Sequence, residues 1–405
     1  MEAVDNYPSD LVTAFAPSVS FLRRGNIRFF TDDESKFSKY WKFFLIIPSI
    51  ALFYTTSVIH ACDLLSQKQI FLVAYLLPPI LVSTQAILKA CVVIPQMAQI
   101  TGMLKELGEL WKTKGITKKQ NYKKTELLKK INFCNSLLHW VSIIGTFQYL
   151  ISPLVETLVR KFILMEECEF LLPIYGSYPL NATNNWISYL LIYIIQFTCV
   201  YICVFIYVGA ELFPITFCAM LGIEFALLRE DLLQLKPENK CDTLAEHRNE
   251  EYTITDFVKS HQRLIELGRQ LDEIFNPIVF IDLFFVGITT CFFRYAGQFA
   301  RGPTYMANNY VAVCSSLTFV LYLCYSGELL MAESIGIGNT AYEIQWYKGD
   351  KYFQKTIWFV IKRSQKPCCL TSLKYATITL NMFTKVMSTT WSYFSLMNTV
   401  YGEEN

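Results

Sequence analysis

Seven apolar stretches, each long enough to cross a bilayer as a helix, constrain this chain more than any other feature of its sequence. They lie at roughly 41–61, 70–94, 133–158, 186–213, 277–296, 309–332 and, with more polar residues, 369–400. Because about 20 mostly apolar residues span the hydrocarbon core, each stretch predicts a membrane-spanning helix. The composition agrees, since only 17% of the residues are charged, against about a quarter in soluble domains. The sequence therefore predicts an all-α membrane protein with seven transmembrane helices.

The distribution of Lys and Arg predicts how the helices are oriented. The N-terminal segment and the second, fourth and sixth connections carry 27 basic residues, whereas the first, third and fifth connections carry five. Cytoplasmic loops hold the excess of Lys and Arg, so the N-terminus is expected in the cytoplasm and the C-terminus outside. Asn181 begins the single Asn-x-Ser/Thr sequon, which falls in the third connection, where glycosylation is possible. This orientation is the reverse of that of a G-protein-coupled receptor.

No motif for catalysis or metal binding is found. The four histidines are far apart, and there is no Cys-x-x-Cys, G-x-S-x-G, P-loop or dinucleotide fingerprint. We therefore predict no enzyme, no catalytic residues, no cofactor and no metal. A net charge of +2 also gives no case for nucleic-acid binding. Cys62 and Cys168 are the cysteines expected on the oxidising side, and their pairing stays open.

Two cytoplasmic connections and the last apolar stretch leave alternatives open. Residues 95–130 and 221–276 have apolar residues at helical spacing, which indicates either helices that extend the spans and bundle together or separately solvated helical loops. The last stretch contains thirteen Thr, Ser or Asn residues as well as Lys374 and Lys385. Polar groups within a span face other helices or water. This helix is therefore either hydrogen-bonded within one bundle or the lining of a water-filled pore.

The stretch 324–400 resembles the insect odorant receptors. The residues that carry this resemblance are Gly327-Glu328, Glu333-Ser334, Ala341-Tyr342, Trp346-Tyr347, Arg363-Ser364-Gln365-Lys366-Pro367 and Ser392-Tyr393-Phe394. The remainder of the chain matches only in hydropathy and inverted orientation. The co-receptor of this family (Orco) has an insertion before the fifth span, which this chain lacks. Gustatory receptors have a Thr-Tyr…Gln-Phe signature in the last helix, whereas this chain has Ser392-Tyr393-Phe394 there. The resemblance is therefore to a ligand-tuning subunit.

The resemblance implies the odorant-binding subunit of an odorant-gated, non-selective cation channel. Members of the family assemble as tetramers with Orco around a central pore, surrounded by membrane lipid, in the plasma membrane of the dendrite of olfactory sensory neurons. The alternative is a metabotropic seven-span chemoreceptor that signals through a cytoplasmic partner. The inverted topology and the polar last helix favour the channel. A transporter is a third possibility, for which no inverted repeat is visible.

The resemblance also implies a division of the chain and a set of functional residues. It implies a cytoplasmic N-terminal segment (1–40), a six-helix ligand-binding bundle with cytoplasmic extensions (41–332), a cytoplasmic anchor region (333–368), a pore-lining helix (369–400) and an extracellular tail (401–405). Leu396 and Val400 match the hydrophobic pore gate, and Tyr342, Trp346 and Tyr347 belong to the anchor, with Trp346 and Tyr347 expected to be buried there. In this family the small volatile ligand lies among spans two to six, in the outer half of the membrane, where a mostly apolar pocket is expected. Depth along the spans, rather than a motif, gives the candidate residues Phe71, Tyr75, Phe147, Gln148, Ile151, Tyr189, Tyr193, Phe197, Phe293, Val313 and Leu317.

Overall fold

The computed structural model describes residues 7–27, 36–67, 70–113, 115–165, 170–174, 185–235, 253–298 and 302–401. Asn181 and Cys168 lie outside these residues. The described helices are α1 (Ser9–Arg24), α2 (Lys36–Ser66), α3 (Ile70–Val93), α4 (Met97–Leu110), α5 (Lys118–Leu158), α6 (Trp186–Gln234), α7 (Ile254–Gln298), α8 (Pro303–Glu343), α9 (Lys351–Ser364) and α10 (Leu380–Tyr401). Short helical turns follow α5 (Val159–Ile163) and α8 (Trp346–Lys348), and the strands β1 (Thr371–Ser372) and β2 (Ala376–Thr377) precede α10.

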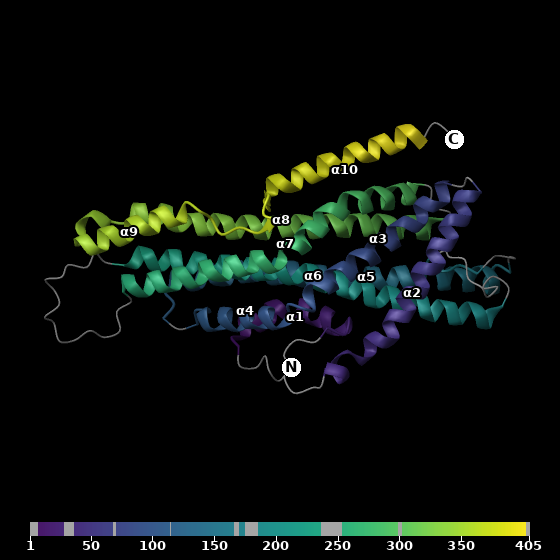
Figure 1. Ribbon diagram of the computed structural model, residues 1–405, viewed down its shortest axis with the longest axis horizontal. Coiled ribbons are helices and arrows are strands. Elements are labelled where there is room, and N and C mark those ends of the chain that lie inside the picture. The colour runs from purple at the N-terminus through teal and green to yellow at the C-terminus, as the bar shows by residue number, and fades with distance from the viewer. Residues whose placement is uncertain are drawn as a thin grey trace.

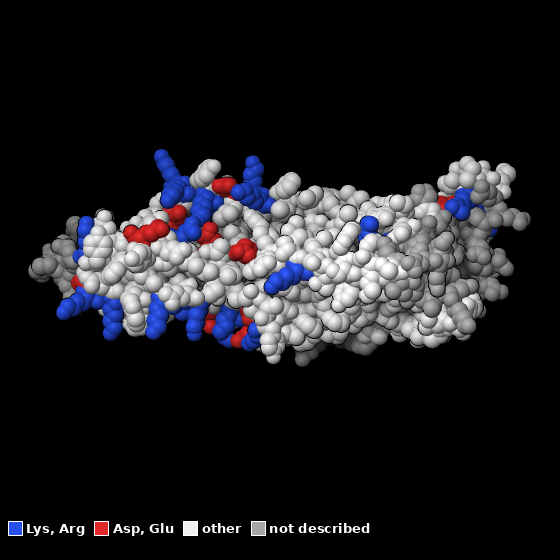
Figure 2. All heavy atoms as spheres, turned by 90° about the horizontal axis from the view of Figure 1, so that it is seen from above, with Lys and Arg blue, Asp and Glu red and all other residues white. Residues whose placement is uncertain are grey.

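Four long helices, α5 to α8, run side by side along the molecule (Figure 1). Six of the described helices, α2, α3 and α5 to α8, are long and apolar enough to cross a membrane. With 49 residues, α6 is about 74 Å long, more than twice the roughly 30 Å of the hydrocarbon core. The long helices therefore continue beyond the bilayer, as the first alternative for the connections predicted. Figure 2 shows charged side chains gathered on the half around α9 and mostly uncharged residues over the other half.

The helix α6 forms the centre of the molecule. Between Phe205 and Leu232 nearly every side chain of α6 is buried, as expected for a helix that is apolar all round. α1 packs along it, with the Phe15 ring 5.3 Å from that of Phe213 and 5.9 Å from that of Phe217. α3, α5, α7 and α8 also contact it. The segment before the first span is thus partly a helix of the bundle.

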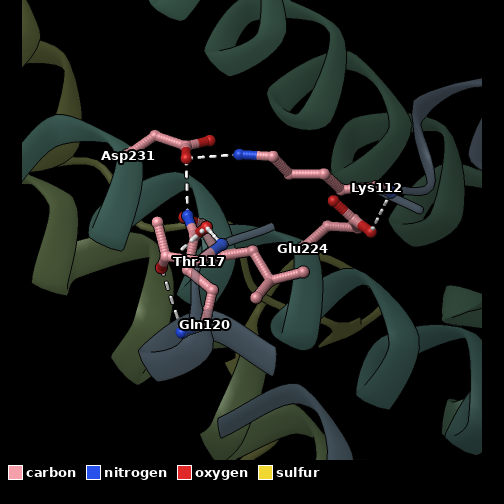
Figure 3. A network of polar contacts seen from close by, with 6 residues as sticks. Lys112, Thr117, Gln120, Glu224 and Asp231 are labelled. Atoms are coloured by element: carbon pink, nitrogen blue, oxygen red, sulfur yellow. Dashed lines mark hydrogen bonds and ion pairs between the residues drawn. The ribbon is translucent and has the colours of Figure 1, made fainter. Parts of the chain in front are cut away.

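Acidic residues on this buried part of α6 hold the connection between α4 and α5 (Figure 3). The Lys112 ammonium pairs with the Asp231 carboxylate, and the Lys112 backbone N–H donates to Glu224 Oε1 at 3.1 Å. Gln120 Nε2 also donates to Asp231 Oδ1, at 2.5 Å. Gln120 and Thr117 form a capping box at the start of α5. The charged half is therefore a packed bundle rather than a set of separate solvated loops.

The last transmembrane helix begins later than predicted. The expected span 369–400 starts with a two-stranded hairpin in which Thr371 pairs with Thr377, and α10 begins only at Leu380. The turn between the strands has Leu373 and Lys374 at positive φ, which no helix continues through. The remaining 22 residues of α10 are about 33 Å long, still enough to cross the hydrocarbon core.

The hairpin is held against α7 and α8 by side chains of both helices. Asp272 Oδ1 accepts hydrogen bonds from the Thr371 N–H at 2.7 Å and from its hydroxyl at 2.6 Å. Glu328 Oε2 accepts from the Leu380 N–H at 3.3 Å. A Cβ added to Gly327 would lie 2.6 Å from the Ile378 carbonyl oxygen. The absence of a side chain at Gly327 thus lets the chain that leads into α10 pass directly against α8.

The anchor region differs from its expected boundary in one respect. α8 runs without a break through residue 333 and ends at Glu343, so the bundle and the anchor share this helix. α9 then packs back along α8, burying Phe353, Ile357 and Val360. The two helices form one unit at the charged end of the molecule (Figure 1).

Candidate functional site

A cavity of about 160 Å³ lies between α3, α5, α6, α7 and α8. Each of these five helices contributes to its wall. Most of the wall is apolar, with Pro79, Val82, Val141, Val200, Val204, Val208, Val286, Phe293, Val311, Ala312 and Phe319. The described lining contains no Asp, Glu, Lys, Arg or His. A cavity of this kind suits a small neutral molecule with few hydrogen-bonding groups.

The polar side chains of the wall are largely engaged within the protein. Gln85 Nε2 on α3 donates to Thr289 Oγ1 on α7 at 3.2 Å, and both side chains are buried. The hydroxyls of Ser83 and Thr146 donate to carbonyl oxygens one turn earlier in their own helices. A hydroxyl oxygen that donates in this way still has lone pairs that can accept. The wall can therefore orient a hydroxyl-bearing ligand through a few weak contacts.

Hydrogen bonds link the helices and the segment 170–174 at the end of the cavity away from α9. Gln148 Nε2 on α5 donates to Asn308 Oδ1 on α8 at 3.2 Å, and Asn308 Nδ2 donates to Ser152 Oγ at 2.9 Å. The Tyr149 hydroxyl donates to the Pro173 carbonyl at 3.2 Å. Gln196 accepts from the Ile174 N–H at 3.2 Å and donates to the Ile174 carbonyl at 2.7 Å. The described segment 170–174 is thereby fixed over α5 and α6.

A buried charge cluster lies next to the opposite end. The Lys89 ammonium on α3 contacts the carboxylates of Glu211 on α6 and Asp282 on α7, and the three side chains are at most 4% exposed. Lys89 Nζ also lies 3.9 Å from the centre of the Tyr207 ring, and Tyr207 lines the cavity. Buried charges are tolerated only when paired. The cluster therefore ties three helices together beside the cavity.

The sequence interpretation did not identify this cluster as functional. Each member is an ionisable residue within a candidate span, and such residues are functional candidates by default. An ionisable side chain within an apolar span is visible in the sequence for all three residues. What the sequence could not show is that Lys89, Glu211 and Asp282 meet, because Lys89 precedes Glu211 by 122 residues and the three lie on different helices.

The helix α7 connects the cavity to α10. Thr289 and Phe293 line the cavity, while Cys291 and Arg294 on the same helix contact α10. Cys291 Sγ lies 3.3 Å from the Thr390 carbonyl oxygen, within hydrogen-bonding distance. The Arg294 guanidinium lies over the Phe394 ring, 4.6 Å from its centre, a cation–π contact. A shift of α7 caused by a ligand would thus reach α10 directly.

Of the predicted ligand-binding residues whose side chains the structure describes, one lines the cavity. This residue is Phe293. Gln148 is bonded to the lining residue Asn308, whereas Phe147 and Ile151 are 37% and 43% exposed on the surface of α5. Val313 is buried and Leu317 half-buried on α8 outside the lining. The side chains of Phe71 and Tyr75 lie outside the described residues.

The aromatic residues predicted on α6 form a separate cluster. Tyr189 is stacked on Phe170 with 4.8 Å between ring centres, and its hydroxyl donates to the Leu171 carbonyl at 2.9 Å. The Tyr193 hydroxyl donates to the Leu150 carbonyl. Phe197 packs against the same cluster. In this structure these side chains hold the segment 170–174 on α6.

The helix α10 lies along the outside of the bundle (Figure 1). Its inner side contacts α7 through Thr390 and Phe394, both buried. Its other side carries a stripe of exposed residues at helical spacing, consisting of Asn381, Lys385, Ser388, Ser392, Ser395 and Thr399. Leu396 lies beside this stripe and is 61% exposed, and the side chain of Val400 is outside the described residues. One face of α10 is therefore polar and uncovered in the single chain.

The predicted anchor residues are less buried than expected in the single chain. Tyr342 and Tyr347 are 71% and 61% exposed. Trp346 is half-buried and packs against the main core. Burial of Tyr347 within one subunit is thus not observed. The exposed tyrosines leave the charged end with apolar surface that a neighbouring subunit could cover.

Comparisons with known proteins show which family this sequence matches. Residues 73–391 match the family described as 7tm Odorant receptor. Odorant receptor 13a of Drosophila melanogaster is 28% identical over 275 residues, which are 63% of this chain and 63% of that receptor. Putative odorant receptor 92a of Drosophila melanogaster is 24% identical over 55% of this chain and 53% of its own length. The aligned part thus spans less than two thirds of these curated relatives.

Solved structures show the same fold. The olfactory receptor OR5 from Machilis hrabei superposes with a TM-score of 0.72, covering 95% of this chain and 97% of that one at 14% identity. Its complex with eugenol superposes with a TM-score of 0.70, covering 96% and 97% at 14% identity. The predicted class of all-α membrane protein is confirmed, and because the family match extends over well more than half of its residues, this chain belongs to the 7tm odorant receptor family.

Proposed function

We propose that this protein is the odorant-binding subunit of an odorant-gated, non-selective cation channel assembled with Orco. Membership in a receptor family sets it apart from enzymes. The observation that carries the proposal is the dual position of α7, which forms part of the cavity wall through Phe293 and contacts α10 through Cys291 and Arg294. Binding and gating would share this helix.

The ligand proposed is a small neutral volatile. The described lining is apolar and uncharged, so a charged ligand would be buried there without a counter-ion, which is costly. Eugenol, which the Machilis hrabei receptor binds, has this character: a neutral ring with one hydroxyl. The residues proposed to touch the ligand are Phe293 and, through Asn308, Gln148. The remaining predicted residues stay proposals for an indirect role in shaping the site.

The pore is proposed to form where α10 helices of several subunits face one another. The exposed polar stripe of α10 supports this proposal, because a polar helix face is unfavourable against lipid and favourable against water. Leu396, beside the stripe, and Val400, one turn further, would form an apolar constriction. The stripe also holds Lys385, and a ring of ammonium groups would oppose cations. Fewer than four copies of this subunit per tetramer reduce that repulsion.

The orientation follows from the charge count and the charged end of the bundle. We place the N-terminus and the end around α9 in the cytoplasm, and Asn181 with the C-terminus outside, in the dendrite membrane of an olfactory sensory neuron. Epitope tags at both ends, read before and after permeabilisation, test this placement. Labelling of an N-terminal tag on intact cells would overturn it. A glycosidase-sensitive shift that is lost in Asn181→Gln would report glycosylation of that loop.

The channel is tested by current in cells that express this chain with and without Orco. An odorant-evoked cation current that needs both proteins and persists when G-protein signalling is blocked is expected. A response that needs G proteins and not Orco would favour the metabotropic receptor instead. The two outcomes can be read in the same cells with the same odorant panel.

A further inference from the structure

The cavity reaches the outer surface of the bundle along the seam between α5 and α8. Val141 on α5 and Val311 on α8 line the cavity, yet their side chains are 39% and 37% exposed. By contrast, the lining residues Val200, Cys203 and Val208 on α6 are buried. One side of the cavity wall is therefore also the outer surface of the molecule.

The surface around this seam is that of a membrane-embedded face. Trp140 and Ile144 on α5 are 59% and 61% exposed, and Leu321 on α8 is 42% exposed. From 131 to 155 on α5 and from 303 to 327 on α8 the sequence contains no Asp, Glu, Lys or Arg. Uncharged stretches of this length match the hydrocarbon thickness. The seam is therefore expected to face lipid tails rather than water.

In the part of the chain that the structure describes, side-chain contacts between helices lie on both sides of the cavity along the bundle axis. Towards one end, Gln148 and Asn308 link α5 to α8, and the segment 170–174 is bonded to α5 and α6. Towards the other end lies the buried cluster of Lys89 with its two carboxylates. We propose that the seam between α5 and α8, at Val141, Gly145 and Val311, is a lateral portal through which neutral odorants dissolved in the bilayer reach the cavity. This inference rests on the proposed function.

Gly145 gives the portal its width. It lines the cavity, and a Cβ placed on it would lie 3.5 Å from Val311 Cγ1, an ordinary van der Waals contact. A Cβ at this position therefore fits without displacing the backbone, and a longer side chain would extend into the seam. A barrier on the path slows association and dissociation by the same factor, whereas cavity volume lost to the new side chain weakens binding and by itself speeds dissociation.

The first test measures the kinetics of odorant-evoked current in cells that express the full chain with Orco. Eugenol, 1-octanol and hexyl acetate are applied, and the one that evokes the largest current is used. Gly145→Leu is expected to slow both onset and washout about tenfold, equivalent to about 1.4 kcal/mol on the barrier; loss of cavity volume without a portal would instead speed washout. Val141→Ala is expected to speed both. Ile144→Trp, next to Gly145 but outside the cavity lining, is the control and should match wild type.

The second test needs no agonist, so it separates this inference from the proposed function. Cys203 lines the cavity, and its thiolate would attack neutral methyl methanethiosulfonate, forming a mixed disulfide and releasing methanesulfinate. Gly145→Leu should slow this labelling in membranes, measured by mass spectrometry, while the exposed Cys62 serves as the internal reference. Unchanged Cys203 labelling and unchanged current kinetics in Gly145→Leu would overturn the portal. A receptor silent to every odorant, with labelling still slowed, would instead count against the proposed function alone.

Discussion

Replacing Lys89 by Met is expected to destabilise the receptor strongly. The Lys89 ammonium is fully buried and contacts two acidic side chains, Glu211 and Asp282, that are 1% and 4% exposed. Its loss would leave both acids buried without a cation and would also remove the contact with the Tyr207 ring. Breaking a buried ion pair by removing one partner costs about 3 to 5 kcal/mol, a large part of the roughly 5 to 15 kcal/mol that keeps a protein folded.

The assay is thermal unfolding of the solubilised receptor, read by fluorescence-detected gel filtration, together with surface biotinylation. Lys89→Met should lower the melting temperature by roughly 5 °C or more and reduce the surface population. The triple variant Lys89→Met, Glu211→Gln, Asp282→Asn should recover most of the loss, because it removes the charges together. Lys105→Met, at an exposed position of α4, is the matched control. A stable single variant, or a triple variant no better than the single one, would refute this account of the cluster.

Three further outcomes are expected. Phe293→Ala removes an aromatic side chain from the cavity wall and with it roughly 1.5 kcal/mol of apolar contact with the odorant. The half-maximal odorant concentration should therefore rise about tenfold; the same half-maximal concentration as in the wild type would exclude contact between Phe293 and the odorant. Gly327→Ala places a Cβ 2.6 Å from the Ile378 carbonyl oxygen, so stability in the thermal assay should fall by about 1 to 3 kcal/mol. Leu396→Ser should raise the basal current with Orco by wetting the constriction, whereas unchanged current and ion selectivity at normal expression would remove Leu396 from the gate.

Hydropathy was sufficient to predict the spans because burial in lipid selects for long apolar runs. It was insufficient at the last span, where the stretch 369–379 looks continuous with the helix but forms a hairpin. The reason is tertiary: Asp272 on α7 bonds the Thr371 backbone, and Gly327 on α8 leaves space for Ile378. Neither contact is visible from local sequence. The same holds for α8, whose uninterrupted course through 333 depends on packing against α9.

Depth along the helices does not predict which residues line the cavity, because depth says nothing about which side of a helix faces inward. Phe147 and Ile151 lie at cavity depth but are exposed on the surface of α5. Gly145 and Thr146 line the cavity, but a glycine or a threonine within a span gives no sequence signal for a pocket wall. Aromatic side chains were favoured as pocket walls. In the structure the cavity is formed mainly by valine, serine and threonine, since small side chains are what leave space.

The motifs that carry the family resemblance have a structural explanation that is separate from ligand choice. Gly327 and Glu328 receive the chain that leads into α10, and Ser334 Oγ accepts from the Cys368 N–H at 3.0 Å. Glu333 pairs with Arg229 at 2.9 Å. None of the motif residues lines the described cavity. They join the long helices to the anchor and to α10. Under the proposed function, these motif residues would carry the signal away from the cavity, and the small residues of α5, α6 and α8 would select the ligand.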